Sequence, residues 1–187
     1  MKKNFIRVPY AMTIHGEEEI EAVNKVLRSS TQMGENTKKF ENEIANLFGH
    51  KYGIGTNSGS SSLLLAMESF DLPPGSEVIT PVLTFATTIG CIVKNNLIPV
   101  FVDVEPLTYC IDVSQIEAQI TEKTVAILAP NLMGNICDWP AIRKIADKAA
   151  TTLQETTIPC TIKILPCEIP VIAKETRSTI VAWPLMP

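Results

Sequence analysis

Short apolar runs alternate with amphipathic segments between Tyr52 and Lys148. Each run is almost continuously hydrophobic, which is typical of strands that are buried on both faces. The segments between the runs carry apolar residues at helical spacing. Strands that alternate with helices favour parallel pairing, because each helix carries the chain back across the sheet. The pattern therefore predicts an α/β fold with three layers, α/β/α, around a partial and mostly parallel sheet.

The expected elements follow directly from these patterns. Strands are predicted at 52–56, 77–81, 99–104 and 124–130, and helices at 60–70, 84–95, 114–120 and 140–148. Two further helices are predicted ahead of the sheet, at 17–27 and 37–48. We expect both to pack outside the sheet.

The alternation stops abruptly after Lys148. The segment 149–187 contains five prolines and no glycine, and no strand–helix period continues through it. Prolines interrupt central strands because they lack a backbone N–H, although short strand-like pieces such as CTIKIL (160–165) remain. We therefore predict one large-domain portion over 1–148. To the atypical tail, 149–187, we assign no domain, and a truncation or a frameshift would explain it.

Composition argues against several classes of partner. The net charge of −4 gives no broad basic surface for nucleic acid or for an anionic membrane. The apolar runs are shorter than the roughly 20 residues that a membrane-spanning helix needs. Five scattered cysteines without a CxxC pair indicate buried free thiols in a reducing compartment rather than disulfides or a zinc site. We expect a cytoplasmic protein without a metal.

Two polar segments stand where predicted strands end and helices begin. The first is NSGSSS (57–62), whose backbone N–H groups and hydroxyls would form an anion site suited to a phosphate. A serine-rich helix cap without a ligand has the same appearance. The second, TPVLTFATT (80–88), contains Phe85, which either stacks on a flat ligand or belongs to the core. Open α/β sheets bind ligands at this edge.

Two more segments follow the later strands. Asp103 comes at the end of one strand and can cap a helix or a turn, and Asp112 lies shortly after it. NLMGN (131–135) follows the last strand and offers uncharged hydrogen-bonding groups. Each of these signals is weak when it is taken alone.

In their order along the chain, these segments resemble the DegT/StrS family of pyridoxal-phosphate (PLP)-dependent sugar aminotransferases and dehydrases. The similarity extends from about Val8 to Lys148 and includes EEEIEAVNKVL, NSGSSSLLLA, PPGSEVITPVLTFATT, IPVFVDVEPLTYCID and NLMGNICDW. The resemblance implies the large domain of a fold-type-I PLP-dependent transferase, here truncated. It also implies PLP as cofactor, a nucleotide-linked sugar and an amino donor as substrates, and a homodimer in intact relatives.

The same resemblance implies roles for individual residues. Gly59, Ser60 and Ser61 would hold the phosphate of PLP, and Phe85 would stack on its pyridine ring. Asn131 would lie near the cofactor, at a position that is often histidine in the family's aminotransferases. The run 133–138, MGNICD, looks more like the dehydrase branch.

The family continues with residues that this chain does not match. These are an aspartate that pairs with the pyridinium nitrogen and a Schiff-base lysine, which is a histidine in the dehydrase branch. Lys163 and Lys174 lie in no matching motif, and both histidines precede the predicted sheet. We therefore assign no catalytic residue. We expect a PLP-dependent nucleotide-sugar aminotransferase or deoxysugar dehydrase of polysaccharide biosynthesis that is catalytically incomplete. The alternative is a non-catalytic phosphate- or PLP-binding fragment, or an inactive truncated product.

Overall fold

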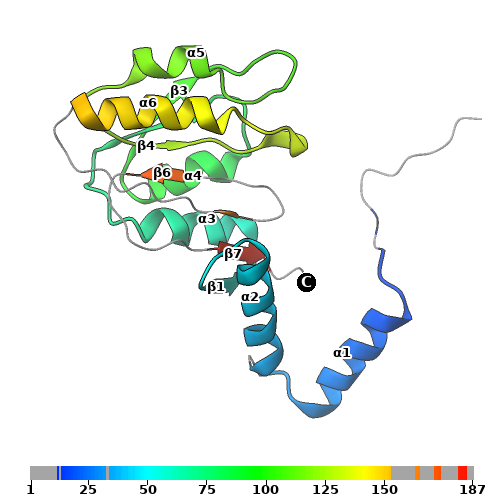
Figure 1. Cartoon of the computed structure of the whole chain (residues 1–187). Coiled ribbons are helices and arrows are strands. Elements are labelled where there is room, and N and C mark those ends of the chain that lie inside the picture. Colours follow the sequence, from blue (N-terminus) through cyan, green and yellow to red (C-terminus); the bar gives the residue numbers. More distant parts are fainter. Residues whose placement is uncertain are drawn as a thin grey trace, which may run out of the picture. The chain divides into compact units, whose positions relative to one another are not determined.

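A computed structural model describes Met12 and residues 14–32, 34–152, 163–164, 171–173 and 181–184 (Figure 1). The chain divides into two compact units, 1–36 and 37–187. The first unit contains α1 (Glu17–Ser29), in which no residue is buried. A carboxylate oxygen of Glu19 accepts a hydrogen bond of 2.6 Å from the Gly16 amide, and this bond lowers the pKa of Glu19. The packing of α1 outside the sheet stays a prediction.

The second unit contains the sheets and the helices that cover them. Helix α2 (Glu35–Leu47) belongs to this unit from Thr37 on. The elements that follow are β1 (Gly53–Thr56), α3 (Gly59–Glu68), β2 (Glu77–Pro81), α4 (Ala86–Lys94), β3 (Ile98–Val102), α5 (Val113–Ile116), η1 (Glu117–Gln119), β4 (Thr124–Leu128), η2 (Leu132–Gly134), α6 (Trp139–Thr152), β5 (Lys163–Ile164), β6 (Val171–Ala173) and β7 (Val181–Pro184).

The larger sheet has four strands in the order β3–β2–β4–β6. Strand β2 pairs in parallel with β3 and with β4, while β6 runs antiparallel to β4. A second sheet has the order β1–β7–β5, and both of its pairs are parallel. The predicted α/β fold with a mostly parallel sheet is confirmed. The pairing of β1 with β7 was not predicted, although β5 does lie within the strand-like piece 160–165.

Alternating residues of the larger sheet face two separate hydrophobic cores. Val78 and Leu128 belong to the cluster that includes residues of α3 and α4. Ile79 and Ile127 belong to the opposite cluster, together with residues of α5 and α6. In Figure 1, β4 lies between α6 and α4. Because successive strand residues point to opposite faces, these two clusters establish the three layers that the sequence predicts.

Three cysteines, Cys91, Cys110 and Cys137, are buried free thiols, as the sequence predicts. Burial raises the pKa of Cys91 and of Cys137 to about 12. Cys160 and Cys167 lie outside the described residues. Among the residues that the structure describes, no cluster of three or more His, Cys, Asp or Glu side chains could hold a metal ion. In the same residues, no helix is both long enough and apolar enough to cross a bilayer.

The core cluster on the α3–α4 face gives a direct test of these layers. Ile92 on α4 is fully buried in it, and its neighbour Val93 is 56% exposed. We expect Ile92→Ala to lower the free energy of unfolding by about 2–5 kcal/mol, because the substitution leaves a cavity. Val93→Ala should change it by no more than about 0.5 kcal/mol. Urea denaturation of both variants measures the difference, and equal effects would contradict the layer assignment.

Candidate functional site

The chain brings the starts of α3 and α4 to one edge of the larger sheet. Helix α3 leads into the beginning of β2, and α4 runs from the end of β2 to the beginning of β3. Since β2 and β3 are parallel, α4 runs against the strand direction and starts at the carboxyl edge. Because α3 leads into the beginning of β2, its end lies toward the amino edge and its start away from it. The two helices also contact one another. This is the edge at which open α/β sheets bind ligands.

Serine side chains build the first turn of α3. Ser58 is the N-cap, and its Oγ accepts a 3.2 Å hydrogen bond from the Ser61 amide. The Ser58 carbonyl oxygen accepts bonds from the Ser62 amide at 3.0 Å and from the Thr56 hydroxyl at 3.0 Å. The hydroxyls of Thr56 and Ser62 are also hydrogen-bonded to each other. These contacts fix the position at which the helix begins.

Two amides at this helix start remain available. Among the described residues, the N–H groups of Gly59 and Ser60 have no hydrogen-bond partner. A Cβ added at Gly59 would meet no atom within 4 Å, so open space lies beside this residue. Free N–H donors at the positive end of a helix dipole favour an anion. The residues present therefore fit a phosphate group.

Phe85 stands at the start of the neighbouring helix. It is the N-cap of α4 and is 70% exposed, so the alternative that it belongs to the core is wrong. The sequence predicted that α4 begins at Thr84, but the structure begins it at Ala86, and Thr84 and Phe85 precede it. The ring is therefore free to lie against a ligand at the carboxyl edge. The structure brings the starts of the two helices to this edge but records no contact between Ser60 and Phe85.

Asn131 follows β4 and is buried, with an exposed fraction of 4%. Its Oδ1 accepts hydrogen bonds from the Cys137 amide at 2.9 Å and from Trp139 Nε1 at 3.1 Å. These bonds join the end of β4 to the beginning of α6. The loop between them holds Met133 at a φ of 56°, a left-handed conformation that is uncommon for a residue with a side chain. Asn131 thus braces a strained loop, a role that the sequence did not reveal.

A second left-handed residue lies in the loop that follows β3. Tyr109 has a φ of 58°, and the two strained loops are joined where Asn135 Nδ2 donates to the Thr108 carbonyl oxygen at 2.8 Å. The Cys110 thiol lies 3.5 Å from the Asn135 carbonyl oxygen and donates to it. Both loops leave the carboxyl edge, whereas the other two left-handed residues with side chains in the described part of the chain, Asp71 and Asn96, follow the ends of α3 and α4.

The two aspartates that the sequence singled out serve local turns. Asp103 Oδ1 accepts a bond of 2.8 Å from the amide of Val104. Asp112 is the N-cap of α5 and accepts 3.0 Å from the Ser114 amide. Hydrogen bonds from the Ser114 and Gln115 side chains lower the pKa of Asp112. Asp103 therefore serves a local backbone bond, and the helix cap in this segment is Asp112, which the sequence did not predict.

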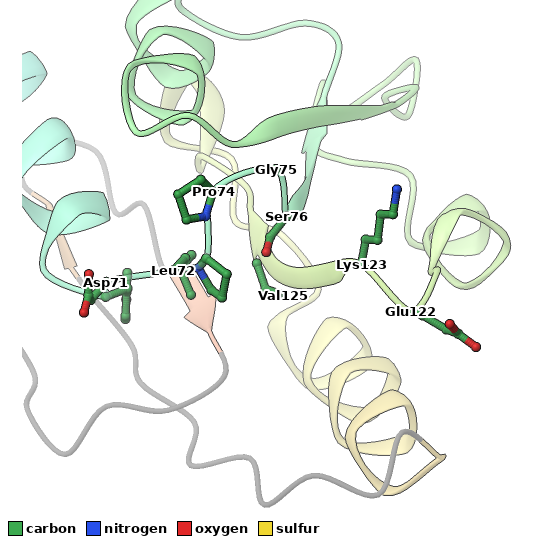
Figure 2. Close-up of a pocket in the computed structure, with 10 residues that line it drawn as sticks. Asp71, Leu72, Pro74, Gly75, Ser76, Glu122, Lys123 and Val125 are labelled. Atoms are coloured by element: carbon green, nitrogen blue, oxygen red, sulfur yellow. The ribbon is translucent and has the colours of Figure 1, made fainter.

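A large hollow lies at the opposite, amino edge of the sheet. Figure 2 shows it between the turn that precedes β2 and the residues that surround the start of β4. Its volume is about 870 Å³, and Asp71, Glu122 and Lys123 are its charged lining residues. In Figure 2 the side chains of Glu122 and Lys123 diverge, so they do not converge on one ligand position. Because its charged side chains do not converge, this hollow is not the candidate site, although it is large.

Comparison with known proteins decides the family. Residues 13–155 match the sequence profile of the DegT/DnrJ/EryC1/StrS aminotransferase family. The chain belongs to this family. Its solved neighbours are PLP-dependent sugar aminotransferases and dehydratases of fold type I, which confirms the resemblance seen in the sequence.

Two curated relatives illustrate the match. A pleiotropic regulatory protein of Geobacillus stearothermophilus is 41% identical over 132 residues, which cover 70% of this chain and 36% of the relative. The GDP-4-keto-6-deoxy-D-mannose 3-dehydratase of Yersinia pseudotuberculosis is 38% identical over 154 residues, which cover 79% of this chain and 39% of the relative. The chain thus spans well under half the length of either relative.

Two solved structures share the fold. The Escherichia coli GDP-4-keto-6-deoxy-D-mannose-3-dehydratase with bound hydrated PLP superposes with a TM-score of 0.73 at 32% identity, over 77% of this chain and 39% of that one. The aminotransferase from Psychrobacter cryohalolentis gives a TM-score of 0.70 at 33% identity, over 75% of this chain and 37% of the aminotransferase.

The Asn131 brace can be tested through stability. Asn131→Ala leaves the buried Cys137 amide and the Trp139 indole N–H without their acceptor, so we expect the free energy of unfolding to fall by about 1–3 kcal/mol. Trp139→Phe removes only one of the two bonds and should cost less than Asn131→Ala if the large ring is otherwise retained. The exposed Asn57 provides the control, Asn57→Ala, and thermal unfolding measures all three. A neutral Asn131→Ala would refute the brace.

Proposed function

We propose that this chain provides the cofactor-phosphate site of a PLP-dependent enzyme that acts on nucleotide-linked sugars. The enzyme class is an aminotransferase or a deoxysugar dehydratase of polysaccharide biosynthesis. The observation that carries the proposal is the start of α3, where the Gly59 and Ser60 amides have no partner among the described residues and open space lies beside Gly59. Membership of a PLP-dependent family supplies the identity of the anion.

Three adjacent residues have distinct roles in this proposal. The amides of Gly59 and Ser60 donate to the phosphate. The Ser61 amide already donates to Ser58 Oγ, so Ser61 contributes through its side chain instead. The Ser58 hydroxyl donates to Ser61 Oγ at 3.0 Å, which leaves the Ser61 hydroxyl proton for the phosphate. The acidic net charge of −4 requires the anion site to be local in this way.

The remaining contacts orient the cofactor. Phe85 offers the face of its ring to the pyridine ring from the start of α4. Asn131 acts through the loop after β4, which its side-chain oxygen holds in place. PLP, when it is bound, supplies an electron sink for the substrate. The nucleotide-linked sugar, the amino donor, a homodimer and a cytoplasmic location complete the proposal by analogy with the family.

The 187 residues by themselves bind but do not catalyse, in our proposal. Transamination needs a base at the substrate carbon and a partner that keeps the ring nitrogen protonated. After Lys148 the lysines are Lys163, in the two-residue strand β5, and Lys174, which lies outside the described residues. Neither stands in a family motif. We therefore propose 1–148 as the cofactor-binding portion and leave 149–187 without a catalytic role.

Binding can be tested with the chain alone. Titration with PLP, followed by tryptophan fluorescence, should give tighter binding than titration with pyridoxal, because only PLP carries the phosphate that the α3 amides bind. Gly59→Val fills the open space beside the donors and should weaken PLP binding by about ten-fold, the factor that corresponds to about 1.4 kcal/mol. Gly90→Val, at another glycine whose added Cβ meets nothing within 4 Å, is the matched control. Equal affinity for PLP and pyridoxal would contradict the proposal that the α3 amides bind the phosphate of PLP.

Catalysis can be tested separately from binding. The protein is mixed with PLP and excess glutamate, and conversion to the pyridoxamine form is followed by absorbance against a protein-free control. We expect no conversion above that control, because binding the phosphate supplies neither the base nor the ring-nitrogen partner. Turnover that disappears in Lys163→Ala or in Lys174→Ala would show that the tail carries a catalytic site.

A further inference from the structure

Thr88 connects the two residues that precede α4. It is buried in the first turns of this helix, with an exposed fraction of 2%. Its Oγ1 accepts a hydrogen bond of 2.9 Å from the Thr84 hydroxyl. Its amide donates to the Phe85 carbonyl oxygen at 2.9 Å. One buried residue therefore holds the side chain before Phe85 and the carbonyl group of Phe85 itself.

Phe85 has little else to fix its direction. The ring is 70% exposed, so packing contributes little to holding it. As the N-cap of α4, Phe85 has no side-chain group that can bond to the first turn of the helix. The Thr84–Thr88 hydrogen bond joins two side chains across this position, so it ties the residue before Phe85 to the first turns of α4. The hydrogen bonds recorded around Phe85 therefore hold its backbone, and through it the direction of its Cα–Cβ bond.

We propose that Thr88 is a positioning residue for the cofactor ring. It holds the Thr84 side chain and the Phe85 carbonyl group, and so fixes the direction in which the Cα–Cβ bond of Phe85 leaves the backbone at the carboxyl edge. The inference rests on the proposed function, in which Phe85 lies against the pyridine ring of PLP. Ordering the ring before binding lowers the entropy cost that the ligand would otherwise bear.

Valine at this position separates positioning from folding. Thr88→Val keeps the volume that α4 buries but removes the oxygen that accepts the Thr84 hydroxyl. The Thr84 side chain is only partly buried, so water can satisfy its hydroxyl. Thr88→Ser does the reverse: it keeps the oxygen that accepts the Thr84 hydroxyl, but it removes a methyl group and leaves a small cavity in the core. Stability and cofactor affinity should therefore respond in opposite ways in these two variants.

The primary test measures PLP affinity in the full chain. We expect Thr88→Val to weaken PLP binding about three- to ten-fold, the range for one hydrogen bond, and Thr88→Ser to keep the wild-type value. Thr84→Val should match Thr88→Val, and the double variant should lose no more, because both remove the same bond. Thr87→Val is the control, since the Thr87 hydroxyl has no bonding partner in the described part of the chain.

A double-mutant cycle with Phe85→Ala shows whether Thr88 acts through the ring. Phe85→Ala alone should weaken PLP binding about ten-fold. Thr88→Val should then cause no further loss in the Phe85→Ala background, because the residue through which it acts is gone. Full additivity would overturn the positioning role while leaving the proposed function intact. An unchanged affinity in Phe85→Ala would instead refute the ring contact, and the proposed role of Phe85 with it.

A second readout needs no cofactor. Relaxation of ¹³C-labelled phenylalanine rings, with the Phe85 signal assigned from its loss in Phe85→Ala, reports how mobile the ring is on the ps–ns timescale. We expect greater mobility in Thr88→Val and in Thr84→Val, and wild-type mobility in Thr88→Ser and Thr87→Val. Unchanged mobility in Thr88→Val would overturn the inference, whatever the PLP affinity.

Discussion

The parallel pairing of β2 with both β3 and β4 is the constraint on which the rest of the structure depends. Parallel strands place all their carboxyl ends at one edge, and the connecting helices must return over the faces of the sheet. Helix α4 therefore begins where β2 ends, while α3 begins where β1 ends and contacts α4. This pairing pattern thus brings Phe85, which follows β2, and Asn131, which follows β4, to one edge of the larger sheet, although they are far apart in the sequence.

The two edges of the sheet differ in how their backbone groups are satisfied. At the amino edge, the Gly75 amide donates to the Asn96 carbonyl oxygen, the Glu77 amide to Lys123 and the Ile98 amide to Ser76, each at 2.8 Å. At the carboxyl edge, two N–H groups of α3 have no partner among the described residues. A ligand gains most from donors that are already ordered and unused, so the hollow of Figure 2 is the less favourable place for an anion.

Hydrophobic pattern was enough to predict the elements between Tyr52 and Lys148, because a buried strand or helix has a period that burial imposes. Strand β2, predicted at 77–81, has the same bounds in the structure. The pattern could not predict that β1 pairs with β7, since short strands do not encode their partners. Nor could it predict the Asn131–Trp139 or Thr84–Thr88 bonds, because polar residues with this spacing also occur in ordinary turns.

The candidate site depends on backbone geometry more than on side-chain chemistry, and this explains how binding and catalysis can be separated. The donors at Gly59 and Ser60 are main-chain amides, which exist wherever α3 begins at this residue. Ser58 determines that starting point by capping the Ser61 amide, and Ser62 and Thr56 support it from the interior. A phosphate site therefore requires only one correctly started helix and its neighbour. A base and a ring-nitrogen partner require side chains from other segments at fixed positions, so the proposed phosphate site does not by itself supply catalysis.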